Sequence, residues 1–425
     1  MASGAARAPR QGNSVSVQGL LAEMRSAAER SRNAAEPFAC LISARGHAEL
    51  GRRSLMASQL SLAWRAPADL SGGAADVAER LRLASRRAFE RGARGLLVLV
   101  THEASACFDR IPVHDDWLGL PRIQMWSAGS VMRRAGGEGR GAWGEPRRPV
   151  KLEAREALES PRLKDWHSHA LSKIHEAIAS GRLYQLCLTF PVSFSPPDDP
   201  ATVFAALLAR NPVDHAAWVS LPDFELLSVS PERFLSVQGR EALLRPMKGT
   251  RRLDGSSTEQ ILRELGESIK DRAENVMITD LARNDLGRVC VPGSVRVESL
   301  FQVERYGSVA QMTSSIRGEL RTGLDVWDTL AAAFPPGSMT GAPKIEACRM
   351  IRELEQGPRG LYGGVLGWVE PGGDAEFSVV IRSLQSRRGE ARWDIGGGIV
   401  HDSEAASEWS EAWAKFAALR HVVST

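Results

Sequence analysis

The stretch "RPMKGTRRLDG" (245–255) contains Lys248, a lysine whose neighbours restrict the backbone on both sides. Pro246 has a fixed φ and Gly249 admits conformations that other residues avoid, so we expect Lys248 to be held on a constrained turn. A lysine amine becomes a nucleophile when burial or nearby cations lower its pKa. Three nearby arginines could supply such cations if they point inward: Arg245, Arg251 and Arg252.

A carboxylate precedes this lysine by one strand–turn–strand excursion. It is Glu232, in "SPERF". A hairpin between the two positions could bring Glu232 beside Lys248, as an acid or base next to a nucleophile. The alternative is a surface lysine that pairs with a surface glutamate, and the residue types alone favour this alternative.

Further carboxylates are spaced along two predicted helices. Asp271 and Glu274 are three residues apart and share one helix face. The final helix carries a second stripe, made of Glu404, Glu408, Glu411 and Lys415. Spacing alone favours a solvated face with helix-supporting ion pairs. The other interpretation is that each helix offers a carboxylate pair to one Mg²⁺, which prefers oxygen ligands and leaves places for substrate oxygens.

Three features could bind an anion. The glycines of "DIGGGIV" (394–400) would let backbone amides approach an anion, or they form a flexible turn. The loop "PPGSMTGAPK" (335–344) enters a helix whose N-terminus could hold an anion, or it only punctuates two helices. Arg382, in "VVIRSL", is predicted to lie inside an apolar strand, where it needs a carboxylate from the protein or the substrate.

Hydrophobic periodicity predicts the elements that must position these residues. Strand-like alternation is clearest over 182–194, and a short apolar run at 95–100 predicts a buried strand. Strands outnumber a simple βαβ alternation, which predicts an α+β body with a mixed or antiparallel sheet. The segment 127–151 is rich in Gly, Arg and Pro and predicts a loop or linker. Helical spacing is found over 76–93, 165–181, 201–212, 271–287 and 403–423.

The composition is that of an ordinary globular protein. The chain has 425 residues, 43% hydrophobic, and its net charge of +3 is a small remainder of 54 basic and 51 acidic residues. It therefore gives no argument for binding nucleic acid or membranes. Five widely separated cysteines predict neither a zinc cluster nor disulfides, and indicate a reducing cytosol. Without a secretory signal or a long apolar run, we expect a soluble, cytoplasmic protein.

Eight motifs then occur in an order that is typical of one family: "SPERF", "PMKGT", "DRAENVMITDLARNDLG", "FPPGSMTGAPK", "RGLYGG", "FSVVIRSL", "GGGIV" and the Glu-rich final helix. Together they resemble the chorismate-utilising enzymes, over about residues 163–420. The resemblance implies a large α+β fold of two packed, mainly antiparallel sheets with helices outside. It divides the chain into a disordered tail (1–15), an N-terminal subdomain (16–150) and a chorismate-binding catalytic region (151–425).

The resemblance also implies a Mg²⁺-dependent reaction on chorismate, which is a dicarboxylate. Glu274 and Glu411 resemble the metal ligands, with Asp271 and Glu408 in support. The implied substrate-binding residues are Arg382, Tyr362, Gly397, Gly398, Lys415, Thr250 and Gln311.

Lys248 separates the branches of the family. Anthranilate synthases usually have "PIAGT" here, whereas aminodeoxychorismate synthases component I resemble "PIKGT" and the present "PMKGT". In that branch the lysine attacks the ring and expels the hydroxyl para to the ring carboxylate, and ammonia then displaces the lysine. Glu232 matches the catalytic glutamate. Asn275 and Gln311 replace two histidines of many members, which leaves Glu232 with more of the proton transfer.

The sequence contains no pattern of a glutamine amidotransferase. The resemblance therefore implies free ammonia, or a separate glutamine amidotransferase partner, and a product on the p-aminobenzoate and folate route. A clear "LLES"-like stretch is also missing, so a tryptophan site is not expected. Two alternatives remain open: a neighbouring activity that makes anthranilate, isochorismate or salicylate, and a catalytically silent homologue that only binds.

Overall fold

The computed structural model describes Met24, Ser26, Ala27, Arg30 and residues 36–42, 54–67, 70, 72–109, 111–115, 117–134, 152–155, 158–253, 257–306, 309–420 and 423–424. The predicted tail 1–15 lies outside the described residues, as does 135–151 of the predicted linker.

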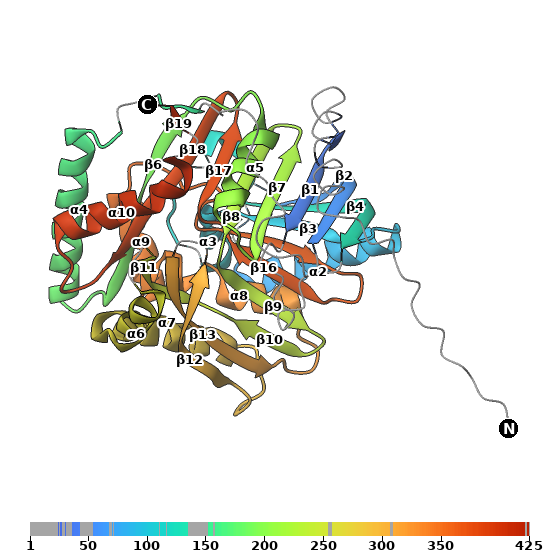
Figure 1. Cartoon of the computed structure of the whole chain (residues 1–425). Coiled ribbons are helices and arrows are strands. Elements are labelled where there is room, and N and C mark those ends of the chain that lie inside the picture. The colour runs from blue at the N-terminus through green and yellow to red at the C-terminus, as the bar shows by residue number, and fades with distance from the viewer. Residues whose placement is uncertain are drawn as a thin grey trace.

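In the described part of the chain, seventeen strands form one continuous antiparallel ladder. This ladder lies at the centre of the molecule (Figure 1). Its first half runs through β14 (Gly341–Ala342), β6 (Gln185–Phe194), β18 (Glu390–Ile399), β17 (Ser383–Arg387), β8 (Phe224–Ser230), β7 (His215–Leu221), β1 (Phe38–Ile42) and β2 (Ser54–Arg65). Its second half continues through β4 (Ile123–Arg134), β3 (Leu96–Val100), β15 (Val365–Val369), β16 (Ala375–Val379), β9 (Arg233–Gln238), β10 (Glu241–Leu244) and β13 (Val309–Glu319). β11 (Met247–Arg252) shares one edge of β13 with β10, and β12 (Arg296–Tyr306) pairs with the other edge.

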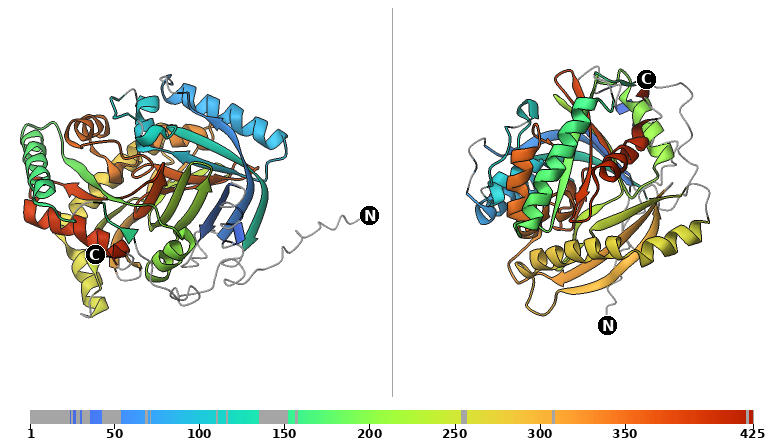
Figure 2. Two further views of the ribbon diagram at one scale, coloured as in Figure 1. Left: turned by 90° about the horizontal axis from the view of Figure 1, so that it is seen from above. Right: turned by 90° about the vertical axis from the view of Figure 1, so that its left-hand side faces the viewer.

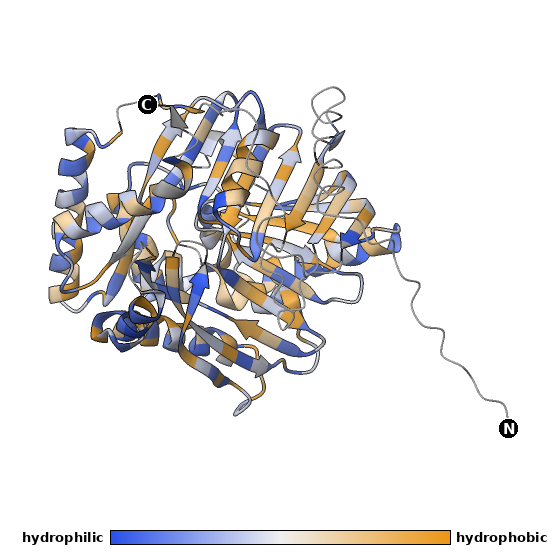
Figure 3. Ribbon diagram, in the orientation of Figure 1, coloured by the Kyte–Doolittle hydropathy of each residue, from blue (hydrophilic) through white to orange (hydrophobic). Residues whose placement is uncertain are grey.

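The two halves of the ladder pack face to face. Leu226 of the first half and Trp126 and Leu366 of the second belong to one buried cluster that lies between them. This arrangement confirms the predicted α+β class with antiparallel sheets. Figure 3 shows why the strands are interior and some helices are not: the strands are largely hydrophobic, whereas α6 (Thr258–Glu267) is mostly hydrophilic.

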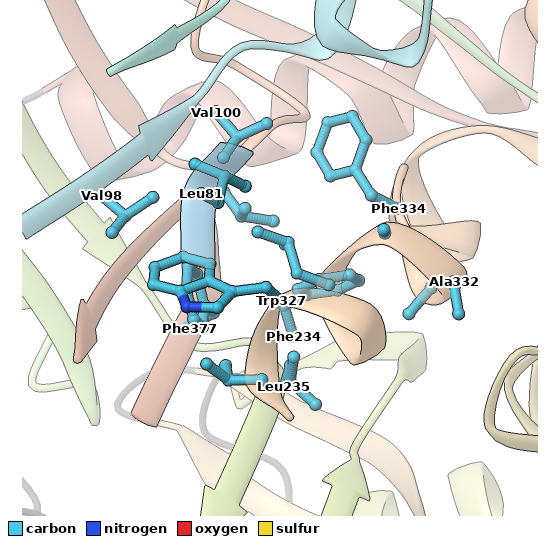
Figure 4. Packing of buried hydrophobic residues seen from close by; sticks show 14 of the residues in the cluster. Leu81, Val98, Val100, Phe234, Leu235, Trp327, Ala332, Phe334 and Phe377 are labelled. Carbon is cyan, nitrogen blue, oxygen red and sulfur yellow. The ribbon is translucent and has the colours of Figure 1, made fainter. Parts of the chain in front are cut away.

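Helices cover the outer faces of both halves. On the second half, Leu81 of α2 (Ala74–Glu90) and Trp327 of α8 (Val326–Ala333) pack with Phe234 and Phe377 (Figure 4). Each large side chain that is fully buried in this way contributes about 1.5–3 kcal/mol. α5 (Pro200–Arg210) and α10 (Ala405–Arg420) cover the first half. Both views of Figure 2 show α4 (Pro161–Ala179) beside α10.

The remaining elements are short or surround the site. They are α3 (Ser105–Asp109), α7 (Ile269–Gly287), α9 (Lys344–Leu354), the 3₁₀ turns η2 (His102–Ala104), η3 (Trp117–Gly119) and η4 (Gly337–Met339), and the small parallel pair β5 (Leu152–Glu153) and β19 (Val423–Ser424). None of the helices in the described part of the chain combines the length and apolar character needed to cross a membrane. The five cysteines are buried free thiols.

The predicted helices and the two clearest strands are confirmed to within a few residues. The linker prediction is wrong for 127–134, which is the second part of β4 and pairs with β2. Backbone pairing holds this part in place while side chains such as Ser130 and Arg133 are exposed, so it lacks the alternating pattern of a half-buried strand.

Candidate active site

A cavity of roughly 180 Å³ lies where β6, β18 and α10 meet β11, β13 and α7. Its wall includes every residue that the sequence analysis assigns to catalysis, metal binding or substrate binding: Glu232, Lys248, Thr250, Asp271, Glu274, Gln311, Tyr362, Arg382, Gly397, Gly398, Glu408, Glu411 and Lys415. Residues that are almost 200 positions apart in sequence therefore meet in one place.

The predicted hairpin exists and carries Glu232 to the lysine strand. β9 and β10 pair directly after Glu232 and return the chain to Met247. The carboxylate of Glu232 accepts hydrogen bonds from the backbone N–H of Met247 and the hydroxyl of Ser338. Burial raises the pKa of Glu232 to about 7, although these two bonds and the charge of Lys248 favour the ionised form. A carboxyl group with this pKa can donate or accept a proton near neutral pH.

Lys248 lies on strand β11 and not on a turn, so the prediction of a constrained turn is wrong. The chain is nevertheless irregular there, because the pairing with β13 shifts register between Met247 and Thr250. Gly249 has a φ of +86°, and a Cβ at this position would lie 3.1 Å from the side chain of Asp271. Glycine therefore allows both the irregular backbone and the close approach of α7.

The three glycines of 396–398 form part of strand β18, so the flexible-turn alternative is wrong. Their missing side chains make room for other groups. A Cβ on Gly398 would lie 2.8 Å from Nζ of Lys248 and 2.4 Å from Nε2 of Gln185. The lysine amine thus occupies the space that a side chain on Gly398 would fill.

Gln185 is a site residue that the sequence analysis missed. It is 1% exposed, and its Oε1 has no hydrogen-bond partner among the described atoms. The available signal was a glutamine at the start of a mostly apolar strand, which is a weak indication of function.

Four carboxylates from two helices face the cavity. α7 supplies Asp271 and Glu274, and α10 supplies Glu408 and Glu411. The solvated-face interpretation does not fit Glu408, which is 3% exposed, but it fits Glu404, which is exposed and lies off the cavity wall.

The suitability of these carboxylates for Mg²⁺ depends on how closely they are gathered and on their other partners. Within the described ranges, no group of three or more His, Cys, Asp or Glu side chains is gathered closely enough to hold a metal ion. Mg²⁺ is often held by only one or two carboxylates, with water and substrate oxygens completing its shell. Burial raises the pKa of Glu274. The charges of Lys248 and Lys270 oppose this shift in the pKa, and the smaller effects of Asp271 and Glu411 add to it. Oε2 of the buried Glu408 has no hydrogen-bond partner among the described atoms. These like charges and this free oxygen fit a Mg²⁺ held by two carboxylates.

Cationic groups also line the cavity. The prediction that Arg382 lies inside a strand is wrong. Arg382 lies in the connection between β16 and β17, where it has a φ of +51° and is half-buried. Nζ of Lys415 donates to the carbonyl of Gly396 at 2.7 Å. Burial lowers the pKa of Lys415, whereas the nearby carboxylate of Glu411 raises it. The net result is a raised pKa for Lys415. Burial also raises the pKa of Tyr362, which keeps its hydroxyl protonated.

Two of the three arginines near Lys248 are already paired. Arg245 forms an ion pair with Glu304, and Arg251 with Asp271 at 2.5 Å. Both charges are therefore offset locally, and the side chain of Arg252 lies outside the described residues.

Asn275 lies off the cavity wall, where its side-chain amide donates to the carbonyl of Met312. Gln311 is on the wall, and its Nε2 donates to Oγ1 of Thr250 at 3.4 Å.

A buried ion pair beneath the cavity was also missed. Arg359, which is 2% exposed, pairs with Glu355 at 2.6 Å. It also donates to the carbonyls of Met339 at 2.6 Å and Cys187 at 2.9 Å, and so ties the loop that carries Ser338 to strand β6. Arg359 opens the motif "RGLYGG", in which the sequence analysis gave a role only to Tyr362.

A second cavity of about 330 Å³ lies between the two halves of the ladder and is lined by residues such as His215 and Trp368. It contains none of the predicted site residues.

The first cavity defines the class of protein. A buried glutamate with a raised pKa beside an amine, within a ring of carboxylates and cations, is typical of an enzyme active site for an anionic substrate. The chain belongs to the chorismate binding enzyme family, whose sequence model matches residues 143–421.

Two groups of relatives are equally similar in sequence. Aminodeoxychorismate synthase component 1 of Bacillus subtilis is 37% identical over 278 residues, which are 65% of this chain and 59% of that protein. Anthranilate synthase component 1 of Mycobacterium tuberculosis is 37% identical over 257 residues, 59% of this chain and 50% of that protein. The match thus spans little more than half the length of these relatives.

Solved structures share the fold. Anthranilate synthase component I of Streptococcus pneumoniae superposes with a TM-score of 0.67 at 24% identity, over 78% of this chain and 81% of that chain. MenF, the menaquinone-specific isochorismate synthase of Escherichia coli, superposes with a TM-score of 0.71 at 19% identity, over 91% of this chain and 89% of that chain.

Proposed function

We propose that this chain is an aminodeoxychorismate synthase component I. It converts chorismate and ammonia to 4-amino-4-deoxychorismate and water, with Mg²⁺, on the p-aminobenzoate and folate route. Ammonia comes from a glutamine amidotransferase partner. The observation that carries the proposal is the position of Lys248, whose amine projects to Gly398 on the wall of the cavity that also holds Glu232.

The geometry supports a reaction in two displacements. In the first, Nζ of Lys248 forms a bond to the substrate ring, the C–O bond of the hydroxyl breaks, and Glu232 donates the proton that lets it leave as water. In the second, ammonia forms the new C–N bond, the bond to Lys248 breaks, and Glu232 takes up a proton. A glutamate with a pKa of about 7 can serve in both directions.

The remaining wall residues position the substrate. Arg382, Tyr362 and Lys415, with the amides of Gly397 and Gly398, bind the substrate carboxylates. Glu274 and Glu411 would hold Mg²⁺, which when bound supplies the positive charge that a dicarboxylate substrate requires.

Anthranilate synthesis is the second candidate, because the relatives with that activity are equally similar in sequence. Lys248 favours the first candidate, since the family resemblance places alanine at this position in anthranilate synthases.

The test is to incubate the full chain with chorismate, Mg²⁺ and an ammonium salt, and to identify the product by mass spectrometry and NMR. We expect an amino group para to the ring carboxylate, and no amination without ammonium. Anthranilate, isochorismate or salicylate as the main product would favour a neighbouring activity. No turnover at saturating ammonium would favour a silent homologue.

A further inference from the structure

Three of the four carboxylates that α7 and α10 offer to the cavity lie beside cations in this structure. Lys415 pairs with Glu411 at 3.0 Å and Arg251 with Asp271 at 2.5 Å. Nζ of Lys270 lies 3.6 Å from Oε1 of the buried Glu408. Three of the four candidate metal-binding or supporting carboxylates therefore have a cationic partner from the chain itself.

These partners are not equally fixed. Lys415 is anchored a second time by the carbonyl of Gly396. Lys270 and Arg251 also line the cavity, but their side chains are 51% and 46% exposed. The distance of 3.6 Å from Lys270 to Glu408 is too long for a hydrogen bond.

Glu408 does not depend on Lys270 for its position. The same Oε1 accepts the hydroxyl of Ser403 at 2.6 Å, while Oε2 has no hydrogen-bond partner among the described atoms. An ion pair in which one partner is half-exposed costs little to break, because water solvates the released cation. A divalent cation between α7 and α10 would take over the neutralisation of Asp271 and Glu408.

We propose that Lys270 and Arg251 are exchangeable cations, which neutralise Glu408 and Asp271 without metal and bind a carboxylate of the substrate once Mg²⁺ is present. This inference rests on the proposed function, since it requires both Mg²⁺ and an anionic substrate. The long, flexible side chains at the cavity wall allow the change of partner without movement of the backbone.

Replacing Lys270 should change the affinities for Mg²⁺ and for chorismate in opposite directions. Without its internal competitor, Lys270→Met should bind Mg²⁺ about two- to fivefold more tightly, the range expected for the loss of a half-exposed ion pair. With Mg²⁺ saturating, the same variant should bind chorismate more weakly, because one cation of the substrate site is missing. A lysine with a purely structural role would not move the two affinities in opposite directions.

The first measurement is a titration of the full chain with Mg²⁺ alone, by calorimetry or by the fluorescence of Trp409 and Trp413 on α10. The second is the KM for chorismate at saturating Mg²⁺. Arg251→Met should behave like Lys270→Met, whereas Lys270→Arg should retain both affinities. Lys173→Met is the matched control, because Lys173 pairs with Glu176 on the surface of α4 and should change neither.

Unchanged or weaker Mg²⁺ binding by Lys270→Met, with a normal unfolding temperature, would overturn this inference alone. If the unaltered chain binds no Mg²⁺, the metal part of the proposed function fails together with the inference. An unaltered chain that binds Mg²⁺ but aminates no chorismate would overturn the proposed function and, with it, the substrate half of the inference.

Discussion

At the scale of single residues, the site depends on the contrast between Glu232 and Lys248. Glu232 is buried, with 4% of its surface exposed, and accepts hydrogen bonds from two donors, whereas Lys248 reaches into the cavity beside a glycine. Residue types alone favoured a surface lysine, because Gln185 and Gly398, which lie around its amine, are distant in sequence. Only the ordered family motifs predicted its position, and the structure supplies the physical reason.

The buried Glu232 should make stability depend on pH. In the unfolded chain its carboxyl titrates near its ordinary value of 4.5, and in the folded chain at about 7. As pH rises, the carboxyl group loses its proton at a lower pH in the unfolded chain than in the folded chain. The free energy of unfolding therefore falls between about pH 4.5 and 7. Glu232→Gln removes the effect, and between pH 4 and 8 the variant should gain on the order of 3 kcal/mol relative to the unaltered protein.

Urea unfolding at both pH values checks this. A difference in unfolding free energy that stays constant with pH would show that Glu232 is not held in a protonation-sensitive position.

Gly398→Ala should damage the reaction more than the fold. The added methyl group would lie 2.8 Å from the amine of Lys248, which must move aside. We expect kcat to fall by about 100-fold, the loss typical of a displaced reacting group, with a stability cost of about 1–3 kcal/mol. Steady-state kinetics and thermal unfolding measure both. Gly372→Ala is the control, because nothing lies within 4 Å of its added Cβ. Full activity in Gly398→Ala would contradict the assigned position of Lys248.

At the scale of elements, sequence periodicity identified the helices well and the irregular strands poorly. α7 and α10 show clear helical spacing, so the two carboxylate pairs could be placed on them from sequence. The sequence did not decide whether the glycines of β18 form a strand or a turn. They leave room for the side chain of Lys248, but three consecutive glycines are also typical of a turn. The predicted location of Arg382 was wrong. The apolar pattern predicts one strand through this position, but the positive φ of Arg382 interrupts it.

The Arg359–Glu355 pair should stabilise the loop that carries Ser338. Arg359→Met leaves Glu355 buried without its cation, which typically costs 3–5 kcal/mol. The activity–pH profile should shift as well, because the loop no longer holds Ser338 against Glu232. Arg349→Met on the exposed face of α9 is the control and should change stability by less than about 0.5 kcal/mol. Denaturant unfolding and a pH–rate profile test both parts, and an unchanged profile would leave Arg359 with a structural role only.

At the scale of the whole molecule, the sequence did not reveal how the two ends of the chain meet. β3 pairs with β15 and β1 pairs with β7, so strands of the first 134 residues are inserted among those of the catalytic region. Such long-range pairing leaves no local pattern. The family motifs implied two packed sheets, but the pairing shows that they form one ladder.

This topology predicts that residues 151–425 do not fold alone. Without β1 to β4, the buried cluster around Leu226 and Leu366 would be open to water. We expect the isolated fragment to lack the cooperative thermal transition of the full chain, measured by circular dichroism at matched concentration. A sharp transition, with Mg²⁺ or chorismate binding retained, would show that the catalytic region is an independent domain.

The central claim is that Lys248 forms a covalent bond with the substrate, and peptide mass spectrometry tests it most directly. The full chain is incubated with chorismate and Mg²⁺ without ammonium, then quenched and digested. We predict a mass increase of one chorismate less one water on the peptide containing Lys248, which disappears when ammonium is added and never forms in Lys248→Ala. The absence of this adduct, together with full amination by Lys248→Ala at the same ring position, would contradict the account.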